Sequence, residues 1–309
     1  MTYPSVAPAT PEDATVPADR PSRLHGRWLL LARGSWISVV VLTLVICFAS
    51  LPVYIALLQT PCVGMACEWQ QLTPARVAAL AGIGLSLAVY AAIIVALTLA
   101  TLVVCLVVST LIIWRRPDDR MALVVALALV MFGPTIAVTA VIAVPSPWQV
   151  PYECFTFLNS SLSVLVFLLF PSGQFVPRWT RWFLVVFLAV QAPVDFFAVA
   201  PLLPNNPISQ PGFLLAASEL ATVVLVQLHR YRRVSSPRER QQTKWVVFGI
   251  AVTITVLVLL TMLTLIFPVL AESTSLYPLT YNLFGACWPL FFPLSFGVAM
   301  LRSRLWDID

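Results

Sequence analysis

The sequence contains very little charge. Asp, Glu, Lys and Arg make up only 10% of its 309 residues, whereas hydrophobic residues make up 60%. A water-soluble globular chain usually carries about 25% charged residues, because water must wet its surface. Too few charged residues are present to cover such a surface, so we expect lipid to solvate most of the outside of this protein.

Histidines and the signatures of common enzymes are also scarce. The chain has two histidines, and it lacks a P-loop, a His-Glu-x-x-His motif, a Gly-x-Ser-x-Gly motif and a glycine-rich dinucleotide fingerprint. Both histidines lie in segments that we expect on the cytoplasmic side, so few ligands are left for a metal within the membrane. We therefore expect no catalysis by this chain, no metal and no cofactor.

Charges of one sign form no continuous patch. The net charge of +5 and the isoelectric point near 9.1 are typical of proteins with acidic partners such as nucleic acids. The basic residues, however, stand singly or in short groups between apolar runs, and they build no basic face. A charge bias set by membrane orientation explains them better, so we expect the lipid bilayer as a partner and no nucleic acid.

Long apolar runs fill most of the remaining sequence. Residues 1–27 are rich in Pro and Ala without hydrophobic periodicity, which predicts a disordered cytoplasmic tail, and residues 28–309 then form a multi-pass transmembrane domain. A helix needs roughly 20 apolar residues to cross a bilayer. The runs predict an all-α integral membrane protein, a helical bundle of about eight transmembrane helices with both termini cytoplasmic. The expected spans are residues 36–58, 86–114, 121–144, 152–170, 182–200, 213–228, 245–270 and 279–301.

One apolar run is too long for a single span. Val77–Trp114 carries no charge over 38 residues. As a helix it would measure about 57 Å, nearly twice the ~30 Å hydrocarbon core. We expect its first part to form a separate outer helix, with Thr73 as N-cap and Pro74 at the first helical position, and the span to begin near Ser86. A second irregularity, Gly133-Pro134, predicts a break within the third span.

The basic residues follow the expected alternation of loops. Of the 18 Lys and Arg, all except Arg76 fall in segments that the eight spans place on the cytoplasmic side. Cytoplasmic segments of membrane proteins are enriched in Lys and Arg, and a miscounted span would scramble this alternation. The distribution therefore indicates both the number of spans and their orientation.

Two cysteines lie together in the first outer loop. Residues Cys62 to Cys67 read CVGMAC, and Gly64 allows a turn tight enough to bring the two thiols together. The extracytoplasmic side permits oxidation, which favours a structural disulfide between Cys62 and Cys67. A redox-sensing pair and a pair of metal ligands are the alternatives, although the spacing matches no specific metal pattern.

Two carboxylates lie inside expected spans, where an ionisable group is costly unless it is paired or hydrated. Asp195 and Glu219 are both expected roughly 7–10 Å below the outer surface. Other polar side chains fall at a similar depth, namely Gln191, Asn159, Tyr281 and Asn282. Our hypothesis is a shared cavity that binds a small ligand, or that holds a carboxyl protonated and responds to pH. The alternative is that these groups only bridge neighbouring helices.

The cytoplasmic loop before the seventh span contains a helix start. Ser236, Pro237 and Glu239 fit a capping box, in which Ser236 caps the helix and Glu239 reaches back. We expect the basic residues of this loop to lie against anionic headgroups, and docking of a partner domain is the alternative.

Several boundary segments together resemble a known family. They are QTPCVGMACEWQQLTPAR (Gln59 to Arg76), RRPDDRMAL (Arg115 to Leu123), FPSGQFVPRW (Phe170 to Trp179), SSPRERQQTKWVVFG (Ser235 to Gly249) and LRSRLWDID (Leu301 to Asp309). These segments resemble the N-terminal multi-pass membrane sensor region of bacterial sensor histidine kinases. The resemblance covers nearly everything after the tail.

The resemblance implies a sensory input domain in a bacterial plasma (inner) membrane, acting in two-component signal transduction. It further implies a homodimer and a cytoplasmic kinase or other signalling partner. The phospho-acceptor helix and nucleotide-binding boxes of that family have no counterpart up to Asp309, so we carry over no kinase activity. A small-molecule transporter or channel is the alternative function, and a non-signalling membrane scaffold is a second alternative.

The orientation can be checked by labelling. We expect an impermeant maleimide to label Ala78→Cys, in the expected outer helix, on intact cells, and to label Ser236→Cys only after the cells are opened, because the basic loop faces inward. The protein with its native cysteines is the control. Labelling of Ser236→Cys on intact cells would invert the threading.

Overall fold

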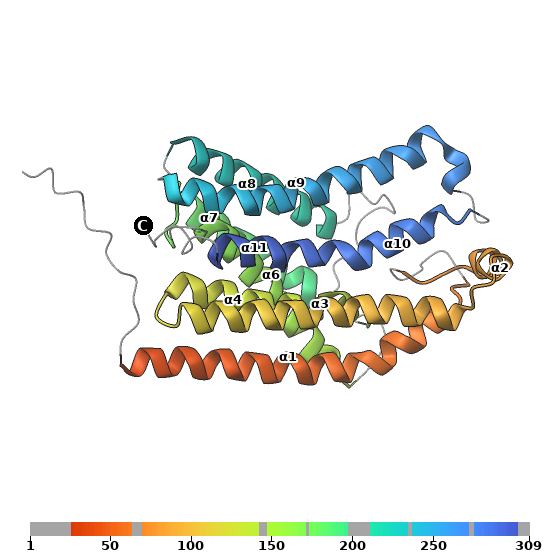
Figure 1. Cartoon of the computed structure of the whole chain (residues 1–309), viewed down its shortest axis with the longest axis horizontal. Coiled ribbons are helices and arrows are strands. Elements are labelled where there is room, and N and C mark those ends of the chain that lie inside the picture. Colours follow the sequence, from red (N-terminus) through yellow and green to blue (C-terminus); the bar gives the residue numbers. More distant parts are fainter. Residues whose placement is uncertain are drawn as a thin grey trace, which may run out of the picture.

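The computed structural model describes residues 26–63, 70–141, 147–170, 173–196, 211–233, 237–271 and 275–301. Long helices running side by side carry most of these residues (Figure 1). In chain order the helices are α1 (Arg27–Gln59), α2 (Pro74–Gly82), α3 (Leu87–Arg115), α4 (Arg120–Phe132), α5 (Thr135–Val141), α6 (Gln149–Leu169), α7 (Thr180–Phe196), α8 (Pro211–Arg233), α9 (Pro237–Ile266), η3 (Pro268–Ala271), α10 (Tyr277–Cys287), η4 (Trp288–Leu290) and α11 (Phe291–Leu301).

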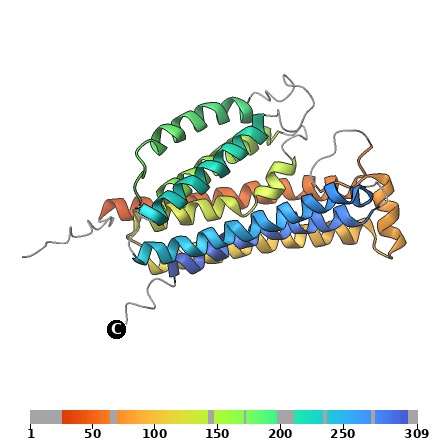
Figure 2. The same cartoon turned by 90° about the horizontal axis from the view of Figure 1, so that it is seen from above.

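The helices form a main bundle and a smaller lateral pair. Figure 2 shows α7 and α8 as a tilted pair on one side, with α3, α9, α10 and α11 along the opposite side. Helix α6 joins the two parts, because it packs against α4 and α5 of the main bundle and against α7 and α8 of the pair. Helix α11 packs mainly against α9 and α3.

Five described helices are long and apolar enough to cross a membrane. They are Leu29–Gln59, Leu87–Arg115, Gln149–Leu169, Lys244–Ile266 and Leu279–Met300, and the bent pair α4 and α5 makes a sixth if it is one span. The all-α, multi-pass prediction is therefore confirmed. The described parts of α7 and α8, predicted as the fifth and sixth spans, do not reach this length and hydropathy.

The predicted division of the long apolar run is confirmed. Helix α2 begins at Pro74, and α3 begins after Ser86, whose hydroxyl accepts a hydrogen bond from the Val89 backbone N–H at 3.2 Å. Thr73 occupies the N-cap position of α2 as predicted, but its hydroxyl forms no capping hydrogen bond. The Thr73 hydroxyl is instead buried and has no hydrogen-bond partner among the described residues.

The predicted break at Gly133-Pro134 separates α4 from α5, whose axes differ by 48°. Gly133 also lets α4 approach α3 closely. A Cβ added to Gly133 would lie 2.8 Å from Leu102 Cδ1 and 3.1 Å from Leu102 Cα, closer than van der Waals contact allows. The glycine therefore serves both the bend and the packing of α3 on α4.

Buried apolar side chains form three clusters. The first joins α1, α3, α5, α6 and α10 around Tyr54 and Tyr152, and the second joins α3, α4, α6, α9 and α11 around Phe296. The third is smaller and holds α7 and α8 on α6. A hydrogen-bonded link crosses the second cluster, since the Trp36 indole donates to Ser109 Oγ at 2.8 Å and Ser109 donates to the Ala126 carbonyl at 2.9 Å.

The outer faces of the helices expose large apolar side chains. Examples are Leu30, Val41, Phe48, Val186, Leu225, Leu259 and Leu265. Water-soluble monomers rarely expose apolar surface that continues over several helices. Hydrocarbon is the solvent that such a surface fits.

Basic residues gather at one end of the bundle. The α3–α4 turn, the start of α7 and the α8–α9 turn lie at the same end as the start of α1, and α2 lies at the opposite end (Figure 1). The first group of segments carries Arg115, Arg116, Arg178 and Arg181, whereas α2 carries Arg76. The helices thus separate Arg76 from these four arginines along the long axis.

Arg230 of α8 is an exception to the expectation that this basic region lies against headgroups. Its side chain is only 2% exposed. The guanidinium donates to the backbone carbonyls of Leu168 and Phe170 at the end of α6, and to those of Gln174 and Val176 in the following loop. The carbonyls of Leu168 and Phe170 lie at the end of α6, where carbonyls have no partner within the helix and carry the negative end of its dipole. The expectation was wrong for Arg230, because its buried guanidinium is bonded to these carbonyls.

Replacement of this arginine should destabilise the bundle. Arg230→Leu leaves several buried carbonyls without donors, and hydrogen bonds to charged groups contribute about 1.5–3 kcal/mol each. We expect a loss of at least about 2 kcal/mol in unfolding free energy, measured by denaturant titration in detergent micelles. Arg232→Leu, on the exposed surface of the same helix, is the matched control. An equal loss in both variants would contradict the role assigned to Arg230.

Candidate functional site

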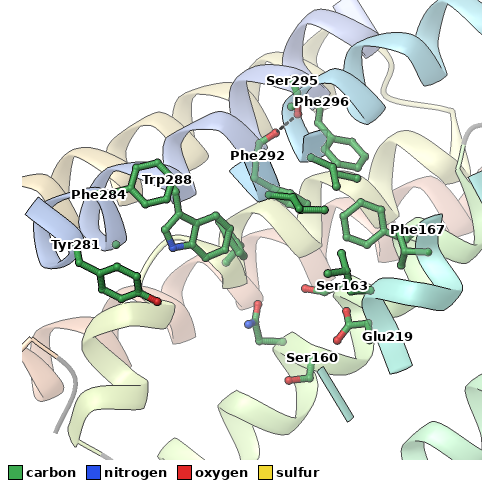
Figure 3. A pocket seen from close by; sticks show the side chains of 18 residues that line it. Ser160, Ser163, Phe167, Glu219, Tyr281, Phe284, Trp288, Phe292, Ser295 and Phe296 are labelled. Atoms are coloured by element: carbon green, nitrogen blue, oxygen red, sulfur yellow. Dashed lines mark hydrogen bonds between the residues drawn. The ribbon is translucent and has the colours of Figure 1, made fainter. Parts of the chain in front are cut away.

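A cavity of about 520 Å³ lies between α8 and the main bundle. Its walls come from α6, α8, α9, α10, η4 and α11, with Phe132 of α4 (Figure 3). Helix α8 packs against α6, α7 and α9, and it has at most slight contact with α10 and α11. The cavity occupies the space that this arrangement leaves open.

Aromatic rings form one side of the cavity. Phe132 contacts Trp288 edge-on, with ring centres 6.0 Å apart, and it also contacts Phe292 at 4.6 Å. Phe167 of α6 contacts both Phe292 and Phe296 of α11, at 5.6 and 5.9 Å. This continuous series of rings connects α4, α6 and α11 (Figure 3).

Polar side chains gather on the other side. Figure 3 shows Ser160 and Ser163 of α6 near Glu219 of α8. The Glu219 carboxyl forms no hydrogen bond or ion pair with any residue that the structure describes. No Lys, Arg, His or other acidic residue is among the described residues that line the cavity.

Asn159 adds a second unsatisfied group. Its side chain is 6% exposed, and its Nδ2 donates to Thr135 Oγ1 at 3.2 Å. Its Oδ1 is buried and accepts no hydrogen bond within the described residues. A buried acceptor without a donor is uncommon in proteins, and it points to a bound partner such as water or a ligand.

The cavity lies near the middle of the helices. Asn159 is ten residues from each end of α6, which corresponds to about 15 Å along the helix. This is about half the thickness of a ~30 Å hydrocarbon core. The sequence predicted a shallower position for Asn159, because it placed the start of the helix at Tyr152 instead of Gln149.

The structure brings together three of the six predicted polar residues. Asn159, Glu219 and Tyr281 all line the cavity. Asp195 and Gln191 lie elsewhere, on α7, where Gln191 Nε2 donates to both carboxylate oxygens of Asp195 at 2.9 Å.

Asn282, the sixth residue, belongs to a polar network at the α2 end of the bundle. Its Nδ2 donates to the Tyr90 hydroxyl at 3.0 Å, and Tyr90 donates to the Gln70 carbonyl at 2.8 Å. Tyr54 donates to Gln70 Oε1 at 2.5 Å. Gln70 has a φ of 69°, in the left-handed region that few non-glycine residues adopt. The network therefore ties α1, α3 and α10 to the end of the first outer loop.

The sequence did not reveal this network. Its members lie on separate elements, and the Asn282–Tyr90 pair is 192 residues apart in the chain. Local spacing contains no information on such a pair. The left-handed backbone conformation of Gln70 also could not be predicted from the sequence, since glutamine has no preference for that conformation.

The remaining predicted sites lie partly outside the described residues. Cys62 is disulfide-bonded, and Cys67, its predicted partner, is outside them, so the pairing stays a prediction. Helix α9 begins at Pro237 as predicted, but Ser236 and the side chain of Glu239 also lie outside what the structure describes. Within the described residues no group of three His, Cys, Asp or Glu could hold a metal ion.

Comparison with known proteins finds no matching family model, curated protein or solved structure. The class of the protein therefore comes from its own fold. Its five or six candidate spans and its exposed apolar surface define a multi-pass helical membrane protein.

Two buried tyrosines provide a test of the outer network. Tyr90→Phe removes both the donor to the Gln70 carbonyl and the acceptor for Asn282, so we expect a loss of about 1–3 kcal/mol in unfolding free energy. Tyr152 is equally buried, but its hydroxyl has no hydrogen-bond partner among the described residues. Tyr152→Phe should leave stability unchanged or raise it. Denaturant titration of both variants measures the difference, and similar losses would contradict the network.

Proposed function

We propose that this chain is a membrane sensory domain that receives a small ligand in the cavity and signals through α11. One observation carries the proposal: α11 itself forms part of the cavity wall, with Phe292, Ser295 and Phe296. A ligand between α8 and α11 would contact both helices directly. The last described helix of the chain would then respond without any intermediate element.

The proposal includes the role that the resemblance implies. The domain acts as a homodimer in a bacterial inner membrane and passes its signal to a cytoplasmic kinase or another signalling partner. Supporting this, the resembling motif LRSRLWDID begins at Leu301, the last residue of α11. No catalytic activity or cofactor is assigned to the chain.

Eight transmembrane spans are part of the proposal, because α7 and α8 have apolar outer faces. Val185 and Val186 of α7 and Leu225 of α8 are more than half exposed. The buried polar residues of α8 face inward, and Gln227 donates to the Phe167 carbonyl at 2.8 Å. A helix with its polar residues inside and its apolar residues outside suits lipid. Such a helix has a low average hydropathy without being a surface helix of a soluble protein.

The orientation follows from the charged end of the bundle. The start of α1, the α3–α4 turn and the α8–α9 turn form the end rich in arginine. The positive-inside rule assigns this end to the cytoplasm, which makes both termini cytoplasmic and places α2 outside.

The contact between α9 and α11 offers a route for the signal. A Cβ added to Gly249 of α9 would lie 2.8 Å from Ser295 Cβ of α11. Both residues line the cavity, so an occupant of the cavity meets this close helix contact. Signalling requires two packings of these helices whose balance the ligand shifts, and a close contact of this kind has few intermediate positions.

Two matched substitutions test the site. We expect Glu219→Leu to abolish the response of a reporter strain that carries the intact signalling partner, because it removes the only carboxyl among the described residues of the cavity. Asp195→Leu should retain the response, since Asp195 is also an intramembrane acid but lies on α7 outside the cavity. A normal response with Glu219→Leu would sink the assignment of the cavity as the receptor site.

A transporter or channel is the second candidate. Two interrupted helices flank the cavity, α4–α5 beside Phe132 and α10–α11 at Trp288, and transporters often have broken helices around a site near the midplane. The sequence shows no convincing internal repeat, which is why the sensory role is preferred. Flux through liposomes that contain the purified protein, compared with protein-free liposomes, separates the two functions.

A further inference from the structure

Two acceptor groups on the polar side of the cavity have no hydrogen-bond donor among the residues that the structure describes. Asn159 Oδ1 is buried without a donor, and the Glu219 carboxyl has no partner among the described residues. The amide Nδ2 of Asn159, which is the donor end, is already engaged by Thr135. A complementary ligand must therefore donate hydrogen bonds at this side of the cavity.

The carboxyl of Glu219 also indicates the charge of the ligand. An ionised carboxylate inside the membrane is costly unless a positive charge lies beside it. No basic side chain is among the described residues that line the cavity. Arg230, a buried arginine of the same helix, is eleven residues beyond Glu219. Its guanidinium is already bonded to backbone carbonyls at the end of α6 and in the following loop. An ionised Glu219 therefore needs a ligand as the source of the compensating charge.

The aromatic side of the cavity fits the same ligand. Seven of the lining residues are aromatic, including Tyr281, Trp288 and Phe292. The faces of aromatic rings attract cations within about 6 Å, and they also solvate apolar chains. A volume of about 520 Å³ falls within the range of cavities that hold drug-sized molecules.

We propose that the cavity binds a lipophilic amine or ammonium compound, with its cationic group between Glu219 and Asn159 and its apolar part against the rings of η4 and α11. The binding site is inferred from the geometry of the cavity alone. The role of the ligand as the stimulus rests on the proposed sensory function. The cation belongs either to a diffusible amphiphile or to the amino headgroup of a lipid, which share this chemistry.

Direct binding tests the proposal without reference to signalling. The probe is tritiated decylammonium, whose nitrogen carries three N–H donors, and its matched control is the uncharged isostere in which carbon replaces nitrogen. The full chain is placed in nanodiscs of phosphatidylglycerol, and binding is measured by equilibrium dialysis against empty nanodiscs. We expect saturable binding of the ammonium probe at one site per chain, and at least tenfold weaker binding of the isostere.

Two conservative variants identify the residues. Glu219→Gln keeps the size and one acceptor oxygen but removes the charge, so it should weaken binding of the ammonium probe about tenfold or more and leave binding of the isostere unchanged. Unchanged binding of the isostere also shows that the variant is folded. Asp195→Asn, which removes an intramembrane carboxylate outside the cavity, should bind both compounds like the native chain.

A third arm distinguishes the two sources of the cation. Competition by phosphatidylethanolamine mixed into the nanodiscs supports a lipid headgroup as the natural ligand, and lack of competition supports a diffusible amphiphile. Absence of saturable binding, or equal binding of the ammonium probe to the native chain and to Glu219→Gln, overturns the proposal. If the ammonium probe binds as expected but Glu219→Leu signals normally in the reporter strain, the binding site stands and its role as the receptor site for the signal fails.

Discussion

Hydrocarbon can neither donate nor accept a hydrogen bond, so the polar groups of the bundle must find their partners within the protein. Arg230 of α8 illustrates this constraint, because its guanidinium is bound entirely within the protein, by carbonyls at the end of α6 and in the next loop. Gln227, one turn earlier, donates to the Phe167 carbonyl of the same helix. The lateral pair α7–α8 is thus fastened to α6 by polar contacts as well as by apolar packing.

Within the described residues, two polar groups of the cavity are exceptions to this rule, as are a few single groups elsewhere, such as the Tyr152 hydroxyl. Glu219 and the Oδ1 of Asn159 both have no partner among the described residues, and both line the cavity. Unsatisfied groups inside a membrane are expensive, and the presence of two of them in one largely apolar cavity is the strongest structural argument for a ligand. Asp195, whose carboxylate is bonded by Gln191, provides no such argument.

The position of the cavity connects it to both ends of the bundle. Helix α11 forms one wall and leads towards the arginine-rich end, whereas α10 joins the network of Tyr90 and Gln70 at the α2 end. The interruption at η4, between α10 and α11, lies beside the cavity at Trp288. In the proposed sensory function, an occupant would change the packing of α11 while the network at the α2 end holds α10 to α1 and α3.

The sequence by itself determined the solvent of the helices, the helical class, the division of the long apolar run before Ser86 and the break at Gly133-Pro134. These features depend on composition, run length and local backbone preferences, which are properties of short segments. Only the tertiary structure decided that Glu219 shares a cavity with Asn159 and Tyr281 while Asp195 does not, and that Arg230 is buried. Depth along a helix can be counted from the sequence, but the direction in which a side chain points depends on how each helix is rotated against its neighbours. That rotation results from packing between residues far apart in the chain.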